Sequence, residues 1–110
     1  MKKTFFAVLS LGLMALGAQA QVDKKTERTW KAKCASCHGA DGKAATDQGK
    51  KAGIPDYSSA EFQKSKTDEQ LKAAIANGVK TDKGEMEGYK DKLSGEEIDN
   101  LVKQVRSFAK

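Results

Sequence analysis

Apolar residues recur at helical spacing in three stretches of the chain. The last stretch predicts a helix that begins at the capping box Ser94–Glu97 and carries its apolar residues on one face: Ile98, Leu101, Val102, Val105 and Phe108. A second helix is predicted from Thr67 to Asn77, because Thr67 and Gln70 have capping-box spacing and Gly78 ends the run. A third is expected from about Asp23 to Cys34.

Shorter signals fill the rest of the chain. Ser58–Glu61 has capping-box spacing and predicts a short helix that carries Phe62. Gly39–Gly53 is polar, contains four glycines and lacks strand alternation, so it is expected to be a loop. Thr81–Tyr89 is also expected to be a polar loop. With no internal repeat, the pattern predicts one all-α domain of three main helices plus a short one.

The first twenty residues are typical of a signal peptide. Met1–Thr4 is positively charged, Phe5–Leu16 is an apolar run of twelve residues, and Gly17–Ala20 offers a small-x-small cleavage site. A membrane-spanning helix needs about 20 apolar residues, which this run does not reach. We therefore expect cleavage after Ala20 and an exported, soluble chain over 21–110.

Composition implies that residues 21–110 need a stabilising element besides their own apolar side chains in order to fold. The whole chain has a net charge of +5, and without Lys2 and Lys3 it keeps 18 basic and 15 acidic residues. Only 12 of these 90 residues are Leu, Ile, Val or Phe, which is too little apolar surface for an ordinary core. A bound group that serves as core is therefore expected. No clustered basic face with interleaved aromatics indicates nucleic-acid binding.

One motif indicates which group is bound. Cys34-Ala-Ser-Cys37-His38 is the C-x-x-C-H attachment sequence of covalent c-type haem. On a helix, both thiols share a face and can reach the two vinyl groups of a porphyrin, while His38 returns beneath the iron. A thiol-disulfide or zinc module is the competing interpretation, but a second cysteine pair, a second histidine and a βαβ pattern are all missing.

From Thr26 to Ala109 the sequence resembles the class I c-type cytochromes, and the amino-acid sequence of Cys34–Lys43 is close to that of the family around its motif. The resemblance implies that helices wrap around one covalent haem c. It also implies a methionine as second iron ligand, and Met86 is the only methionine after the predicted cleavage site. Glu87 stands where the family commonly has proline. Lys83 and Lys90 flank Met86 and are candidate replacements for it at alkaline pH.

The resemblance assigns roles to three further positions. Trp30 takes the place of the family's aromatic residue that packs against the terminal helix. Gln104 stands where an aromatic partner is common, so Trp30 is expected to lack one. Pro55 is the candidate whose carbonyl accepts a hydrogen bond from the far nitrogen of His38 and raises its basicity.

These assignments predict a periplasmic carrier of one electron between Fe(III) and Fe(II) and not an enzyme. Filled axial positions leave no site for a substrate, and no general-acid pair is visible. The alternative is a gas-binding haem sensor or haem peroxidase in which the Met86 ligand is labile or absent. We expect a monomer without stable membrane insertion. Redox partners are expected to dock transiently at the haem edge, near lysines such as Lys33, Lys43 and Lys83.

Overall fold

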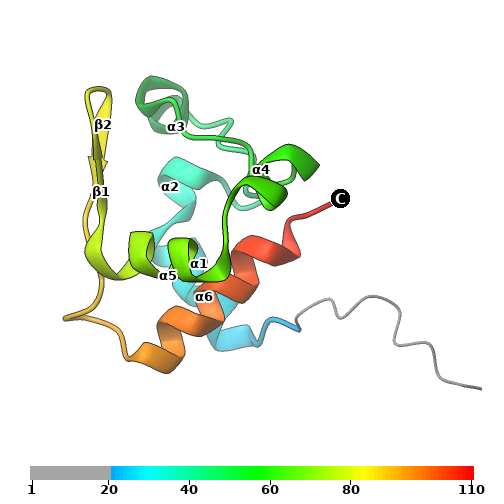
Figure 1. Ribbon diagram of the computed structural model, residues 1–110, viewed down its shortest axis with the longest axis vertical. Helices are drawn as coiled ribbons and strands as arrows, with labels where there is room; N and C mark the ends of the chain where they lie inside the picture. The colour runs from blue at the N-terminus through cyan, green and yellow to red at the C-terminus, as the bar shows by residue number, and fades with distance from the viewer. Residues whose placement is uncertain (1–20) are drawn as a thin grey trace, which may run out of the picture.

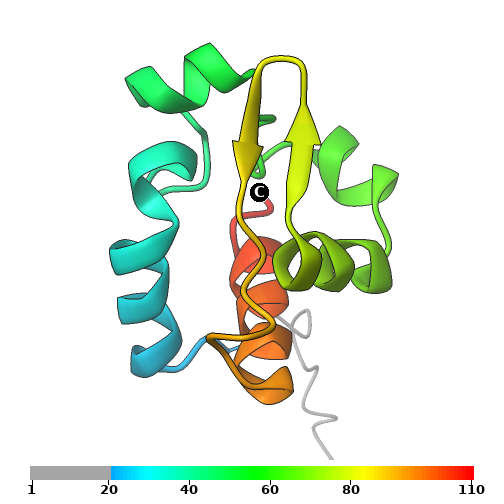
Figure 2. The same ribbon diagram turned by 90° about the vertical axis from the view of Figure 1, so that its left-hand side faces the viewer.

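The computed structural model describes residues 21–110, so the predicted signal peptide lies outside the described part of the chain. Helix α6 (Gly95–Ser107) packs between α1 (Lys24–Lys33) and α5 (Asp68–Asn77), as Figures 1 and 2 show. The shorter helices are α2 (Ala35–His38), α3 (Asp47–Ala52) and α4 (Ala60–Ser65). The mostly helical fold confirms the all-α prediction.

Capping explains where the long helices begin. Asp23 precedes α1 and accepts a hydrogen bond from the backbone N–H of Thr26 at 2.7 Å. Two of the three predicted capping boxes are present, at Thr67–Gln70 before α5 and at Ser94–Glu97 before α6. Each box satisfies backbone N–H groups that would otherwise lack partners in the first helical turn.

The expected capping box at Ser58–Glu61 is wrong. Ser59 caps α4 instead, with its side chain accepting from the backbone N–H of Phe62. Ser58 is held elsewhere, because its backbone N–H and its hydroxyl both donate to Asp56 Oδ1, at 2.8 and 2.6 Å. This local turn shifts the start of the helix by one residue.

Helix α3 lies inside the stretch expected to be a loop. Thr46 caps it by accepting from the N–H of Gly49 at 2.9 Å, and the Thr46 hydroxyl also donates to the carbonyl of Cys37 at 2.8 Å. The helix has six residues and no apolar periodicity, so the sequence pattern carries no signal for it.

A two-stranded antiparallel hairpin replaces most of the loop predicted around Met86. Strands β1 (Val79–Thr81) and β2 (Gly84–Met86) pair with Val79 opposite Met86. The Thr81 hydroxyl fixes the turn by accepting from the N–H of Lys83 and donating to the carbonyl of Gly84, each at 3.2 Å. The ligand candidate Met86 therefore ends a strand.

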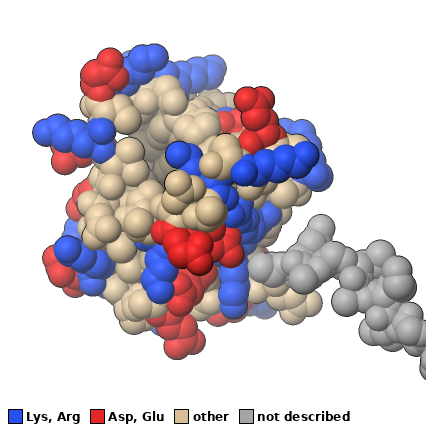
Figure 3. Space-filling model, viewed as in Figure 1, with Lys and Arg blue, Asp and Glu red and all other residues tan. Residues whose placement is uncertain are grey.

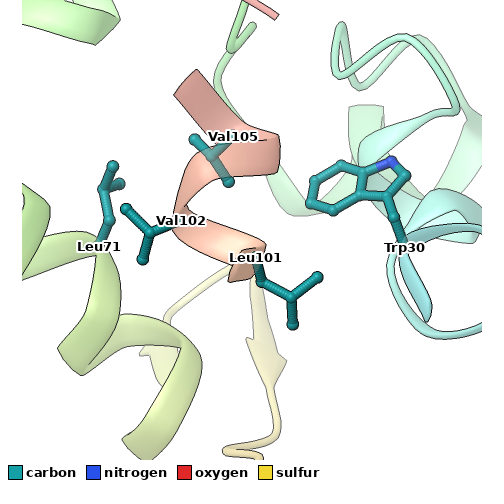
Figure 4. Packing of buried hydrophobic residues seen from close by; sticks show 5 residues of the cluster. All are labelled: Trp30, Leu71, Leu101, Val102 and Val105. Atoms are coloured by element: carbon teal, nitrogen blue, oxygen red, sulfur yellow. The ribbon is translucent and has the colours of Figure 1, made fainter. Parts of the chain in front are cut away.

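The core is small and centres on α6. Its buried cluster joins one residue from α1, one from α5 and three from α6, shown in Figure 4: Trp30, Leu71, Leu101, Val102 and Val105. Arg106 ties the same helix to the α4–α5 junction by donating to the carbonyls of Gln63 and Lys66 and to the Asp68 carboxylate, at 2.7–2.8 Å.

Candidate functional site

The predicted haem-attachment residues lie on one short helical segment. Cys34 directly follows α1 as its C-terminal cap, and its N–H donates to the carbonyl of Trp30 at 2.8 Å; Cys37 and His38 follow on α2. The N–H of His38 donates to the carbonyl of Cys34 at 2.9 Å, which closes the turn. Both thiols are free and half-buried. Burial raises the pKa of Cys34 to about 11, so its thiol is protonated at neutral pH.

His38 is buried in a cluster with two aromatic side chains. Its ring centroid lies 5.5 Å from that of Trp30 and 5.0 Å from that of Tyr57, with the tyrosine ring stacked on the imidazole. Within residues 21–110, its buried Nδ1 has no hydrogen-bond partner. Burial lowers the pKa of His38, which favours the neutral imidazole that binds metals.

The hydrogen bond expected from His38 to Pro55 is not formed in this structure. Pro55 is exposed, and no carbonyl of the described chain accepts from His38 Nδ1. Tyr57, two residues later, packs against the imidazole instead. Its backbone N–H donates to the carbonyl of Gly42 at 2.8 Å, and this bond anchors the segment beside α2. Sequence reasoning missed Tyr57 because the contact depends on the path of an irregular loop.

Trp30 connects the attachment segment to the terminal helix. Its indole N–H donates to the carbonyl of Gly39 at 2.9 Å, and its side chain is buried. The expectation that it lacks an aromatic partner is wrong, because the ring of Phe108 lies 5.1 Å away. Gln104 is buried nearby and donates to Ser107, so the aromatic contact comes from one helical turn further along the chain.

Met86 lies at the end of the hairpin and is half-buried, and its backbone carbonyl approaches Gly78, which follows α5. A Cβ added to Gly78 would lie 2.5 Å from the Met86 carbonyl oxygen, and one added to Gly88 would lie 2.5 Å from the carbonyl of Ala76. Only glycine permits these approaches. They fix the backbone of Met86. From the sequence, Gly78 was predicted only to end a helix, and Gly88 was not singled out.

The residues present fit a covalently held haem. In Figure 3 the surface is hollowed between the hairpin that carries Met86 and the region of α2 and α4. Two half-buried free thiols and a buried imidazole with an unpartnered nitrogen lie on the α1–α2 side. Two thiols for covalent attachment and an imidazole and a thioether for the iron are the groups that a c-type haem with His/Met ligation needs. The described residues hold no cluster of three or more His, Cys, Asp or Glu side chains arranged for a metal ion.

The face that contains this hollow carries charged side chains of both signs, as Figure 3 shows. Lys33, Lys43 and Lys83 are all exposed, as the docking expectation requires. Lys83 lies at the hairpin turn, where a Cβ added to Gly53 would be 3.3 Å from its Cδ, so its stem covers the end of α3. None of the helices in residues 21–110 has both the length and the apolar character needed to cross a bilayer.

Comparison with known proteins found one family model and several similar solved structures. Residues 21–103 match the model of a family described as cytochrome c oxidase, cbb3-type, subunit III. The solved structure of the KustC0563 c-type cytochrome is 34% identical, with a TM-score of 0.68, over 77% of this chain and 98% of that one. A tyrosine-to-phenylalanine mutant of KustC0563 is 35% identical, with a TM-score of 0.66, over 76% of this chain and 96% of that one. No curated protein matches the chain.

Proposed function

Because this chain belongs to the family described as cytochrome c oxidase, cbb3-type, subunit III, and is a small class I c-type cytochrome with covalent haem c, we propose that it carries one electron with iron held between His38 and Met86. As a c-type cytochrome it is a haem c electron carrier. The proposal adds the ligand pair, the Fe(III)/Fe(II) cycle and export to the periplasm.

The observation that carries the proposal is the placement of two half-buried thiols and a buried imidazole on one helical segment, beside a hollow bordered by the hairpin of Met86. When bound, haem c supplies an iron that accepts and releases one electron. Cys34 and Cys37 hold the group through thioethers, and His38 offers a neutral nitrogen. Trp30 and Tyr57 both pack against the imidazole and limit its orientation.

The surroundings of both ligand candidates suit a carrier. Electron transfer is fast when the ligands keep their places in both oxidation states. His38 is held by stacking, and Met86 is held by the hairpin and by the close approach at Gly78. Such a site leaves no open iron position for a substrate, which supports a role without catalysis.

The decisive measurement is the visible spectrum of the ferric protein after haem attachment. We expect the weak far-red band of methionine-to-iron ligation, and we expect it to vanish in Met86→Ala. Val79→Ala is the matched control, because Val79 faces Met86 across the hairpin and is exposed. A wild-type haem spectrum without the band, with rapid binding of carbon monoxide to the ferrous protein, would instead support the gas-binding or peroxidase alternative.

Two further parts of the proposal need their own tests. Export predicts a mature chain that begins at Gln21 and has the mass of residues 21–110 plus one haem. As a cytochrome the chain has redox partners, and we propose that it meets them as a monomer, by transient docking near Lys33, Lys43 and Lys83. Electron exchange with an acidic redox partner should then slow as ionic strength rises. Rates independent of salt would contradict docking through these lysines.

A further inference from the structure

The segment that follows Met86 is anchored to the last turn of α5. The backbone N–H of Tyr89 donates to the carbonyl of Ile75 at 2.9 Å, and the N–H of Lys90 donates to that of Ala76 at 3.1 Å. These carbonyls belong to the end of a helix, where they have no partner within the helix. The anchoring therefore satisfies α5 and at the same time fixes the path of the chain beyond Met86.

The side chain of Tyr89 makes a second connection, to the attachment segment. Its ring is buried, and the ammonium groups of Lys33 and Lys92 lie 5.9 and 5.7 Å from the ring centroid. Both distances are within the range in which a cation is attracted to the negative face of an aromatic ring. Lys33 is the last residue of α1 and directly precedes Cys34. The ring thus links the helix that carries the first thiol to the segment that carries Met86.

The other contacts of this segment are weaker candidates for the same task. Glu87 pairs with Lys92 at 2.9 Å, but the two side chains are 60% and 53% exposed. An exposed ion pair of this kind contributes little, because water and salt screen it. Tyr89 is the one buried side chain in the segment from Met86 to Lys92.

We propose that Tyr89 is a positioning residue for the iron ligand Met86, with its ring contacted by Lys33 and Lys92 and its backbone held by α5. The inference rests on the proposed function, since it presupposes that Met86 binds the iron. The ring attracts the ammonium groups of both Lys33 and Lys92. It thereby keeps the ligand segment close to the attachment helix. This gives the segment a source of rigidity where Glu87 stands in place of the family's usual proline.

The test compares Tyr89→Leu with Tyr89→Phe. External imidazole is titrated into the ferric protein, and its competition with Met86 is followed by loss of the far-red band. Leucine keeps an apolar side chain and the backbone bond but removes the aromatic face. The affinity for imidazole should then rise by a factor of about 5 to 30, equal to about 1–2 kcal/mol. Phenylalanine keeps the ring, so its affinity should stay within about twofold of wild type.

Phe108→Leu is the matched control, because it makes the same kind of change in an aromatic residue that packs on Trp30, next to the other proposed ligand His38. It should lower the stability of the protein without a comparable change in imidazole affinity. The inference is overturned if Tyr89→Leu binds imidazole as wild type does, or if Phe108→Leu raises the affinity equally. If Met86→Ala leaves both the spectrum and the imidazole affinity unchanged, Met86 is not a ligand, and the proposed function fails together with the inference.

Discussion

Replacing Trp30 by phenylalanine measures how strongly the contact between α1 and α6 stabilises the site. The change removes the hydrogen bond to Gly39, whose carbonyl keeps a longer bond of 3.2 Å from the N–H of Gly42. Its loss should therefore cost about 1 kcal/mol, the net value of an ordinary hydrogen bond. The smaller ring buries roughly 40 Å² less apolar surface, which is worth about 1 kcal/mol. We expect a total loss of about 2 kcal/mol.

The assay is thermal unfolding of the haem-loaded protein, followed by far-ultraviolet circular dichroism. For a chain of this size, about 2 kcal/mol lowers Tm by roughly 8–16 °C. Trp30→Leu should cost about 0.5–1.5 kcal/mol more, because it also removes the ring contact with Phe108. A Trp30→Phe variant whose Tm falls by less than about 3 °C would show that neither the indole N–H nor its packing supports the fold.

Three other changes test separate features of the structure. Gly88→Ala places a Cβ 2.5 Å from the Ala76 carbonyl oxygen, so it should weaken the far-red band and lower Tm. A Cβ at Gly95 has nothing within 4 Å, so Gly95→Ala should raise stability by about 0.5–1 kcal/mol. Equal effects of the two variants in calorimetry would contradict this reasoning. Arg106→Met removes hydrogen bonds to two carbonyls and a carboxylate, so it should lower the free energy of unfolding by about 1–3 kcal/mol, measured by urea denaturation. An unchanged urea midpoint would mean that water replaces those bonds without loss of stability. A hydrogen bond from Thr26 lowers the pKa of Asp23, so its stabilising effect is complete above the ordinary pKa and is lost as the pH falls. Asp23→Asn keeps a capping oxygen but cannot titrate, so its Tm should fall less than that of wild type between about pH 5 and pH 3, and parallel curves would rule out this contribution.

The sequence by itself determined the features that depend on near neighbours along the chain. The capping boxes at Thr67 and Ser94 operate across three residues, and so does the spacing of Cys34 and Cys37. Such contacts form within a single helical turn and do not depend on packing against other parts of the chain. The three main helices, the attachment segment and the need for a bound group could therefore be predicted.

The features that the sequence did not predict depend on residues far apart in the chain. Helix α3 is capped by Thr46, whose hydroxyl also bonds to Cys37, and a Cβ added to Gly84 in the hairpin would lie 3.2 Å from the Cβ of Ala52. Each segment is too short to have a periodic pattern of its own. Packing against another part of the molecule stabilises them both, and local propensity does not report such packing.

The tertiary structure alone decided which aromatic residues surround the site. Trp30 contacts the ring of Phe108 and not a side chain at position 104, because the winding of α6 brings Phe108 to it. His38 contacts Tyr57 and not Pro55, because an irregular loop determines which residue lies beside the imidazole. Tyr89 lies beside Lys33 for the same reason: the end of α5 fixes the chain after Met86 in space. Short-range spacing determined which groups could bind the haem. The side chains that hold those groups in place depend on packing between segments distant in sequence, which no local pattern encodes.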